Sequence, residues 1–230
     1  MRLYYFTGSQ FALDNIANRR LKVSFADQVN DIFELNPFDF GEEKDVARAA
    51  RLQWQRSIRN HAKTQGFISF SKSWNSPAMW SHYAENHLGV CYGFDIPSGP
   101  NTTLVEMKYP DKLKKFDHAA LSDRNVLTEM INYAQRHKSQ VWEYEQEWRT
   151  DVSLNKDEQE AKARGASIFY LPFSEKLKLK KIIIGTRSKI TSTQINNALG
   201  PMSGCVEIVT ARASFREYKI VEQKLSRLKK

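Results

Sequence analysis

The stretch VWEYEQEWRTDV, residues 141–152, alternates acidic and aromatic side chains in an otherwise basic chain. The glutamates lie at odd-numbered positions, Glu143, Glu145 and Glu147. The aromatic residues lie at even-numbered positions, Trp142, Tyr144 and Trp148. Successive side chains of a β-strand point to opposite faces. The alternation therefore predicts a strand over residues 142–149, with its aromatic face turned inward and its carboxylates turned toward a cleft. In a helix, Glu143 and Glu147 would repel each other across one turn.

Like charges on one strand face need water, a cation or a ligand to offset their repulsion. One interpretation is a solvated sheet face on which Arg149 is the internal partner of the glutamates. The other is the floor of a site, where two neighbouring carboxylates stabilise a cationic transition state or accept a proton. The segment alone leaves both interpretations open, so the rest of the chain has to decide between them.

The composition indicates one folded domain with polyanionic partners. The 230 residues are 41% hydrophobic, which is enough for a core of their own. Lys and Arg number 35 against 26 Asp and Glu, giving a formal net charge of +9. Such an excess of positive charge favours binding to nucleic acid, to acidic proteins or to anionic cofactors.

Several classes of protein are not indicated. Cys91 and Cys205 are the only cysteines and lie outside any Cys-x-x-Cys pattern, so neither a disulfide framework nor a zinc site is predicted. His82 and His87 are five residues apart and would lie on different faces of a helix, so no metal site is expected from them. The N-terminus lacks a signal-peptide core and no long apolar run occurs, so we expect a soluble, cytoplasmic protein without a membrane partner.

Short strands and helices alternate unevenly along the chain. Strands are predicted over residues 2–6, 21–25, 66–71, 90–96, 104–109, 142–149, 167–173, 179–185, 205–214 and 215–223. Helices are predicted over residues 9–20 and 191–200 and between Ser76 and Gly89, with a helical insertion over 42–65 and a helical segment over 118–139. This pattern predicts an α+β fold in a single domain over residues 1–230, with mixed or antiparallel central sheets and flanking helices.

Three segments carry distinctive motifs. Ser-Phe-Ser occupies 69–71, Met-Trp-Ser-His-Tyr-Ala occupies 79–84 and Tyr-Glu-Gln-Glu-Trp-Arg occupies 144–149. These motifs resemble an uncharacterised bacterial family, the domain of unknown function two-nine-seven-one, whose N-terminus and late IIIGTRS strand the chain also resembles. Two features depart from the family pattern: residues 32–36 form an insertion, and Tyr5 stands where the family often has a basic residue.

The order of elements in this family is similar to that of ADP-ribosyltransferases. In those enzymes a first strand carries His or Arg, a mid-chain strand carries Ser-x-Ser, and a later strand carries Glu-x-Glu or a single Glu. The resemblance implies an ADP-ribosyltransferase-like fold, NAD as substrate and no metal. It further implies an effector of toxin or phage-defence type that modifies nucleic acid or protein, with an antitoxin or immunity protein as candidate partner.

Residue roles follow from this resemblance as hypotheses. Splitting the nicotinamide–ribose bond of NAD builds positive charge on the ribose, as glycoside hydrolysis does. Glu147 is expected to be the catalytic carboxylate that stabilises this charge, and Glu145 is expected to orient or deprotonate the acceptor. The residues expected to bind NAD are Tyr4, Tyr5, Thr7, Ser69, Ser71, Trp80, His82 and Tyr83.

Two other classes of function stay open at this point. A nucleic-acid-binding or metal-dependent nuclease-like effector would use His82, His87 and the acidic residues for metal binding or acid–base chemistry. A non-catalytic partner-binding domain would use Glu143 to Arg149 as a structural ladder of ion pairs. Binding of NAD separates the first hypothesis from these two, and loss of activity on chelation would favour the nuclease.

Overall fold

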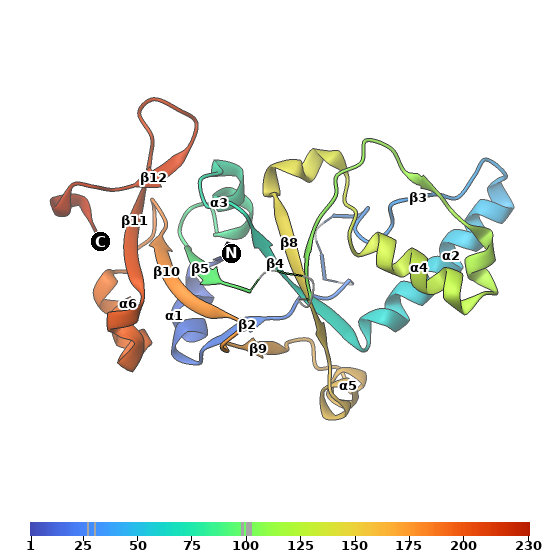
Figure 1. The fold of residues 1–230 in the computed structure, drawn as a ribbon, viewed down its shortest axis with the longest axis horizontal. Helices are drawn as coiled ribbons and strands as arrows, with labels where there is room; N and C mark the ends of the chain where they lie inside the picture. Colours follow the sequence, from blue (N-terminus) through green and yellow to red (C-terminus); the bar gives the residue numbers. More distant parts are fainter. Residues whose placement is uncertain (27, 30, 98, 100–102) are drawn as a thin grey trace.

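A mixed β-sheet forms the centre of the protein (Figure 1). The computed structural model describes residues 1–26, 28–29, 31–97, 99 and 103–230. Within these residues the largest sheet has eight strands in the order β12-β11-β10-β5-β1-β4-β8-β6. Its strands are β1 (Arg2–Thr7), β4 (Gln65–Ser71), β5 (Val90–Asp95), β6 (Leu104–Glu106), β8 (Glu147–Ser153), β10 (Lys178–Ile184), β11 (Glu207–Ala213) and β12 (Ile220–Glu222). Neighbouring strands are antiparallel except β10 and β11, which are parallel.

Helices and short strand pairs flank this sheet. The α-helices are α1 (Ser9–Ala17), α2 (Lys44–Ala62), α3 (Pro77–Tyr83), α4 (Arg124–Ala134), α5 (Lys156–Ala163) and α6 (Ser192–Leu199). The 3₁₀ turns are η1 (His118–Leu121), η2 (Gln140–Glu145), η3 (Gly200–Cys205) and η4 (Ser226–Leu228). Two small sheets pair β2 (Arg20–Lys22) with β9 (Tyr170–Pro172) and β3 (Phe38–Asp39) with β7 (Lys114–Lys115). The predicted combination of a mixed sheet and flanking helices is confirmed.

The α3 helix begins as predicted but ends early. Ser76 is its N-cap, since its hydroxyl accepts a hydrogen bond from the Met79 N–H at 3.4 Å, and Pro77 occupies the first turn. The predicted end at Gly89 is wrong, because residues 85–87 have left-handed backbone angles that no helix can continue through. Gly89 instead packs against β1, where an added Cβ would lie 2.0 Å from the Thr7 carbonyl oxygen.

Helices α2 and α4 form a separate lobe beside the sheet, on the right in Figure 1. An aromatic cluster holds this lobe together: the ring of Phe38 meets those of Trp54 and Phe116 edge-on at 5.0 and 5.8 Å. The predicted helical insertion over 42–65 corresponds to α2. The helical segment predicted over 118–139 is wrong as one run, because Asp123 caps α4 through the Asn125 N–H and separates it from η1.

The C-terminal hairpin is shorter than the sequence predicts. Residues 215–223 contribute only β12, because Phe215 and Tyr218 project into solvent and give the sheet no apolar surface to bury. Residues 104–109 similarly contribute only β6. None of the helices in the described part of the chain combines the length and the apolar character needed to cross a bilayer.

Candidate active site

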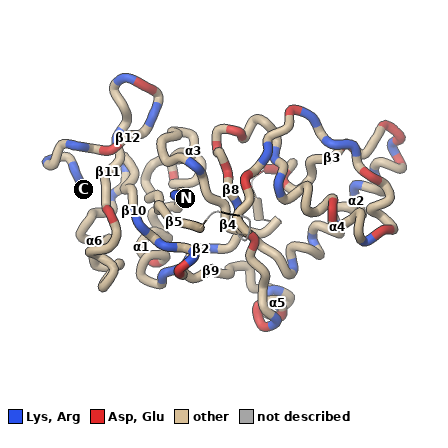
Figure 2. The backbone as a smooth tube through the Cα atoms, in the orientation of Figure 1, with Lys and Arg blue, Asp and Glu red and all other residues tan. Residues whose placement is uncertain are grey.

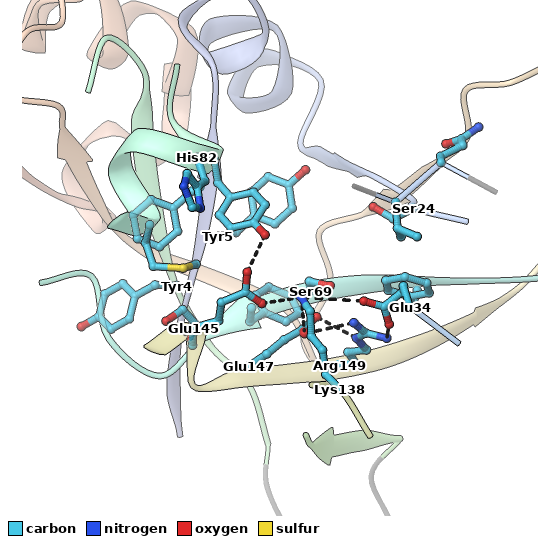
Figure 3. A pocket seen from close by; sticks show the side chains of 18 residues that line it. Tyr4, Tyr5, Ser24, Glu34, Ser69, His82, Lys138, Glu145, Glu147 and Arg149 are labelled. Carbon is cyan, nitrogen blue, oxygen red and sulfur yellow. Dashed lines mark hydrogen bonds and ion pairs between the residues drawn. The ribbon is translucent and has the colours of Figure 1, made fainter. Parts of the chain in front are cut away.

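A cavity of about 390 Å³ opens beside the central strands β1, β4 and β8 (Figure 3). These strands are neighbours in the sheet, but β1 and β4 are paired at one position only, Tyr4 opposite Ser71. In contrast, β4 and β8 are paired from Gln65–Ser153 to Ser71–Glu147. The central sheet thus provides a rigid floor for a site.

The stretch over 142–149 is only partly a strand. Residues up to Glu145 form the turn η2, Gln146 is left-handed with φ 45°, and β8 begins at Glu147. Two contacts from the end of β4 hold this geometry: the Ser71 hydroxyl donates to the Glu145 carbonyl at 2.7 Å, and the Lys72 N–H donates to the Gln146 carbonyl at 3.0 Å. The strand prediction is therefore wrong for residues 142–146.

In this stretch the glutamates face a cavity as predicted, but the aromatic residues do not all point inward. Glu145 and Glu147 are buried, with 3% and 4% exposed surface, and both line the cavity. Trp142 and Tyr144 are only half-buried, and they surround His82, whose Nδ1 lies 2.9 Å from the Tyr144 hydroxyl. The prediction of inward aromatic residues is wrong for these two residues, and so is the interpretation of the glutamates as a solvated sheet face.

Arg149 holds Glu147 in place. Its Nε and Nη2 donate to the two carboxylate oxygens of Glu147 at 2.7 and 3.0 Å, and its Nη1 donates to Glu34 at 2.7 Å. The guanidinium also lies over the Phe67 ring, 4.4 Å from its centroid. Such a bidentate pair fixes both side chains in a single geometry. Glu147 is therefore a carboxylate whose position is fixed mainly by Arg149.

Glu145 has different partners. One of its oxygens accepts a hydrogen bond from the Tyr83 hydroxyl at 2.5 Å, and the other from the Lys138 ammonium at 2.6 Å. Lys138 also lies 3.6 Å from Glu147 and 3.7 Å from Glu34. When all five groups are charged, three carboxylates face two cations, and the cluster carries one net negative charge. A cationic ligand would complete its charge balance.

The pKa values of the two glutamates move in opposite directions. Burial raises the pKa of Glu145 above its ordinary value, and the charge of Lys138 offsets only part of that effect. Burial also acts to raise the pKa of Glu147, but the charge and hydrogen bonds of Arg149, together with the charge of Lys138 and a hydrogen bond with Ser69, outweigh it and hold that pKa below its ordinary value. Paired carboxylates with opposite shifts are typical of sites with one permanently charged group and one that exchanges a proton.

Most of the residues that the sequence singled out lie together. The cavity lining includes Tyr4, Tyr5, Ser69, Ser71, His82, Tyr83, Glu145 and Glu147. Thr7 and Trp80 are buried away from it, which corrects the expectation that they contact NAD. Thr7 is paired with Val90 at the end of β1. Trp80 is a core residue whose Nε1 donates to the Trp74 carbonyl at 2.7 Å and whose ring meets Phe6 edge-on.

Sequence reasoning missed Lys138 and Glu34. Lys138 follows α4, in a polar stretch without a motif, and its ammonium reaches the cavity only because the chain turns back there. Glu34 lies in the 32–36 insertion, 115 positions before its partner Arg149. The insertion was the one available signal for Glu34. His87 stacks on Trp80, away from the lining, and no three His, Cys, Asp or Glu side chains among the described residues are grouped to hold a metal.

Part of the chain matches the model of a known protein family. Residues 79–150 match the family described as "Protein of unknown function (DUF2971)". The resemblance to this family is confirmed. The matched stretch contains Lys138, Glu145, Glu147 and Arg149, so four of the five charged groups of the site lie within it and Glu34 lies outside. No curated protein and no solved structure matches the chain.

The two glutamates are expected to affect stability with opposite pH dependence. The lowered pKa of Glu147 means that its ionisation stabilises the fold above the ordinary value of 4.5, and this contribution is lost as the pH falls through the folded-state pKa. The raised pKa of Glu145 means that its ionisation costs stability as the pH rises above 4.5. The difference between the melting temperature of Glu145→Gln and that of the parent should therefore shift in favour of the variant as the pH rises from about 4 to about 8.

The matched control for this titration is Glu143→Gln, since Glu143 is exposed in the same turn. Its melting temperature should follow that of the parent at every pH. A constant difference between Glu145→Gln and the parent over this range would show that Glu145 keeps an ordinary pKa in the folded protein.

Proposed function

We propose that the chain is an ADP-ribosyltransferase-like enzyme that splits the nicotinamide–ribose bond of NAD and transfers ADP-ribose to a macromolecular acceptor. One observation carries the proposal: Glu145 and Glu147 are buried beside each other in a cavity, with opposite pKa shifts. Breaking an N-glycosidic bond of this kind passes through a cationic, oxocarbenium-like ribose. A fixed negative charge beside the ribose stabilises that state more than it stabilises the substrate.

The charge of the cavity suits the nicotinamide riboside end of NAD. The pyridinium ring of NAD is cationic, and the cluster has one negative charge in excess when all five groups are ionised. The rings of Tyr4, Tyr5 and Tyr83 line the same cavity and offer surfaces for a flat cationic ring. Lys138 and Arg149 are already paired with carboxylates, so the pyrophosphate of NAD would lie toward the cavity mouth.

Each glutamate then has a distinct role. The carboxylate of Glu147, held by Arg149, keeps lone pairs free to accept hydrogen bonds from the ribose hydroxyls and offsets the charge that develops at C1′. As the acceptor's oxygen or nitrogen bonds to C1′, the bond from C1′ to nicotinamide breaks and nicotinamide leaves as a neutral molecule. The proton of the acceptor passes to Glu145, whose raised pKa makes it a stronger base than an ordinary carboxylate.

The arrangement of strands also supports this proposal. The chain supplies Tyr4 and Tyr5 from its first strand, Ser69 and Ser71 from β4, and Glu147 from β8, and these strands are neighbours in the sheet. This is the chain order of the corresponding elements in ADP-ribosyltransferases. An effector of toxin or phage-defence type, neutralised by an antitoxin or immunity protein, is the biological setting we propose for such an activity.

Addition of NAD is expected to raise the melting temperature and to release nicotinamide. A ligand that binds only the folded protein stabilises it by about 2.7 kcal/mol at a hundred times its Kd. NADH is the matched control, because its dihydronicotinamide ring is neutral and the anionic cluster should favour the cationic ring. The measurements are thermal melting with each nucleotide and chromatography of nicotinamide.

Two outcomes would favour the other classes of function. Loss of a nucleic-acid-cleaving activity on chelation, with no response to NAD, would support a metal-dependent nuclease-like effector. No shift in melting temperature at millimolar NAD and no nicotinamide would leave the buried ion pairs with a structural role in a partner-binding domain. Growth arrest on expression of the parent and not of Glu147→Gln would support the effector setting.

A further inference from the structure

Helix α2 carries a series of exposed basic residues, and Figure 2 colours the backbone at Lys and Arg positions blue. Its members are Arg48, Arg51, Arg56, Arg59 and Lys63, and we call them the α2 basic face. All five side chains are exposed, and none of them forms an ion pair with a carboxylate in the part of the chain that the structure describes. The sequence contains no Asp or Glu from residue 46 to residue 84. An ordinary solvated helix face mixes charges of both signs along its length, whereas α2 contains a single acidic residue, Asp45, which is confined to the first turn.

Helix geometry places these cations on one side. At 3.6 residues per turn the five positions fall within an arc of about 140°, and at 1.5 Å per residue they extend over about 22 Å. The opposite side of α2 is occupied by the lobe: Ala50 and Trp54 are buried there with Phe38 and Phe116. The fold therefore uses the inner face of α2 for packing and leaves the basic face free for a partner.

The C-terminal end of α2 connects the basic face to a strand that lines the candidate active site. Helix α2 runs into β4, which contributes Ser69 to the cavity lining. A second cavity of about 300 Å³ is lined by Trp54, Ile58 and Arg59 of α2 and also by Glu34. Because Glu34 lines both cavities, Arg59 of the basic face lies in a cavity that adjoins the site of Glu147.

We propose that the α2 basic face binds the phosphate backbone of a nucleic-acid strand and presents that strand to the cavity as the acceptor. Only the role as acceptor rests on the proposed transferase function, because the binding itself requires no NAD. Four of the five cations are arginines, which grip phosphate oxygens through two hydrogen bonds at once. At about 3.4 Å per nucleotide, the length of the face corresponds to about six phosphates.

The same observations disfavour a membrane as the partner. A basic helix binds a lipid surface by burying its apolar side among the acyl chains. On the apolar side of α2, the large side chain of Trp54 is buried in the lobe, with only 1% of its surface exposed. Its Nε1 donates a hydrogen bond to the Leu35 carbonyl at 3.0 Å. An acidic protein could bind the same cations, and a comparison of oligonucleotide and polyglutamate binding distinguishes it from nucleic acid.

The test compares two triple variants that lose the same charge. Arg48→Gln/Arg51→Gln/Arg56→Gln alters the α2 basic face, and Arg216→Gln/Lys224→Gln/Arg227→Gln alters exposed residues around β12, at the far side of the molecule in Figure 1. The probes are labelled single-stranded DNA and RNA of about 16 nucleotides. The α2 variant should bind at least about tenfold more weakly, and its slope of log K against log salt should fall by about two.

Each other outcome overturns the proposal. Equal losses in both variants would mean that net charge alone drives binding, and an unchanged α2 variant would place the nucleic acid elsewhere. Failure of the parent to bind either oligonucleotide, with binding of a polyglutamate peptide, would assign the face to an acidic protein.

A second readout separates this inference from the proposed function. With labelled NAD, the α2 variant should keep the nicotinamide release that occurs without acceptor and lose transfer of label to the oligonucleotide. If the parent releases no nicotinamide but its oligonucleotide binding depends on the α2 basic face, the transferase proposal fails and the binding surface stands.

Discussion

Replacing Glu147 by Gln is expected to reduce nicotinamide release by about a hundredfold or more. Gln keeps the size of the side chain and one acceptor for Arg149, but it removes the charge that offsets the cationic ribose. The guanidinium of Arg149 keeps its 2.7 Å contact with Glu34, so the variant should stay folded with a lowered melting temperature. The measurement is nicotinamide release per folded protein, at a temperature well below the melting transition of the variant.

Two further variants make this result specific. Glu143→Gln removes a charge from the same turn but from an exposed side chain, so release should stay within about twofold of the parent. Glu145→Gln should spare NAD hydrolysis and lower transfer to the acceptor, because Glu145 takes the acceptor's proton in the proposed mechanism. A folded Glu147→Gln protein that turns over NAD like the parent would remove Glu147 from the catalytic role and leave it as a structural partner of Arg149.

The sequence predicted the cavity-facing carboxylates although it gave the wrong local structure for part of their segment. Period-two alternation requires only that residues two apart share a side, and a turn followed by a strand also meets that condition for Glu145 and Glu147. The turn forms because Ser71, 74 positions earlier, donates its hydroxyl hydrogen to the Glu145 carbonyl. A contact at that separation leaves no periodic signal in the sequence.

Other features of the site also depend on contacts between distant segments, so no local sequence pattern predicts them. One short motif contains Trp80, which is a core residue, and His82 and Tyr83, which line the cavity. The sequence does not show which of these rings is in the core and which lines the cavity. Lys138 and Glu34 enter the site through ion pairs between distant segments. The approximate positions of the central strands along the chain were readable from the sequence, while their order in the sheet and the charge balance of the site needed the three-dimensional structure.

Replacing Arg149 by Met is expected to be the most destabilising single substitution in the site. It leaves Glu34 and Glu147 buried without the guanidinium that both contact at 2.7 Å. Removing one partner of a buried ion pair costs about 3–5 kcal/mol. In a chain of this size each kcal/mol lowers the melting temperature by roughly 2–4 °C, so a fall of about 6–20 °C is expected in thermal unfolding.

The exposed pair of Arg164 and Glu160 provides the matched control. Their side chains are 71% and 69% exposed, and Arg164→Met should change the melting temperature by no more than about 4 °C, since such pairs contribute roughly 0–1 kcal/mol. The double variant Arg149→Met/Glu147→Gln should recover part of the loss, because it removes one of the uncompensated charges. The difference in melting temperature between Arg149→Met and the parent should also narrow as the pH falls, because protonation relieves the unpaired buried carboxylates of the variant as the pH approaches 4.5 and the parent loses the contribution of Glu147 below 4.5. Equal, small shifts for Arg149→Met and Arg164→Met would mean that the buried cluster contributes no net stability, and that its charges are retained for what they do to a ligand.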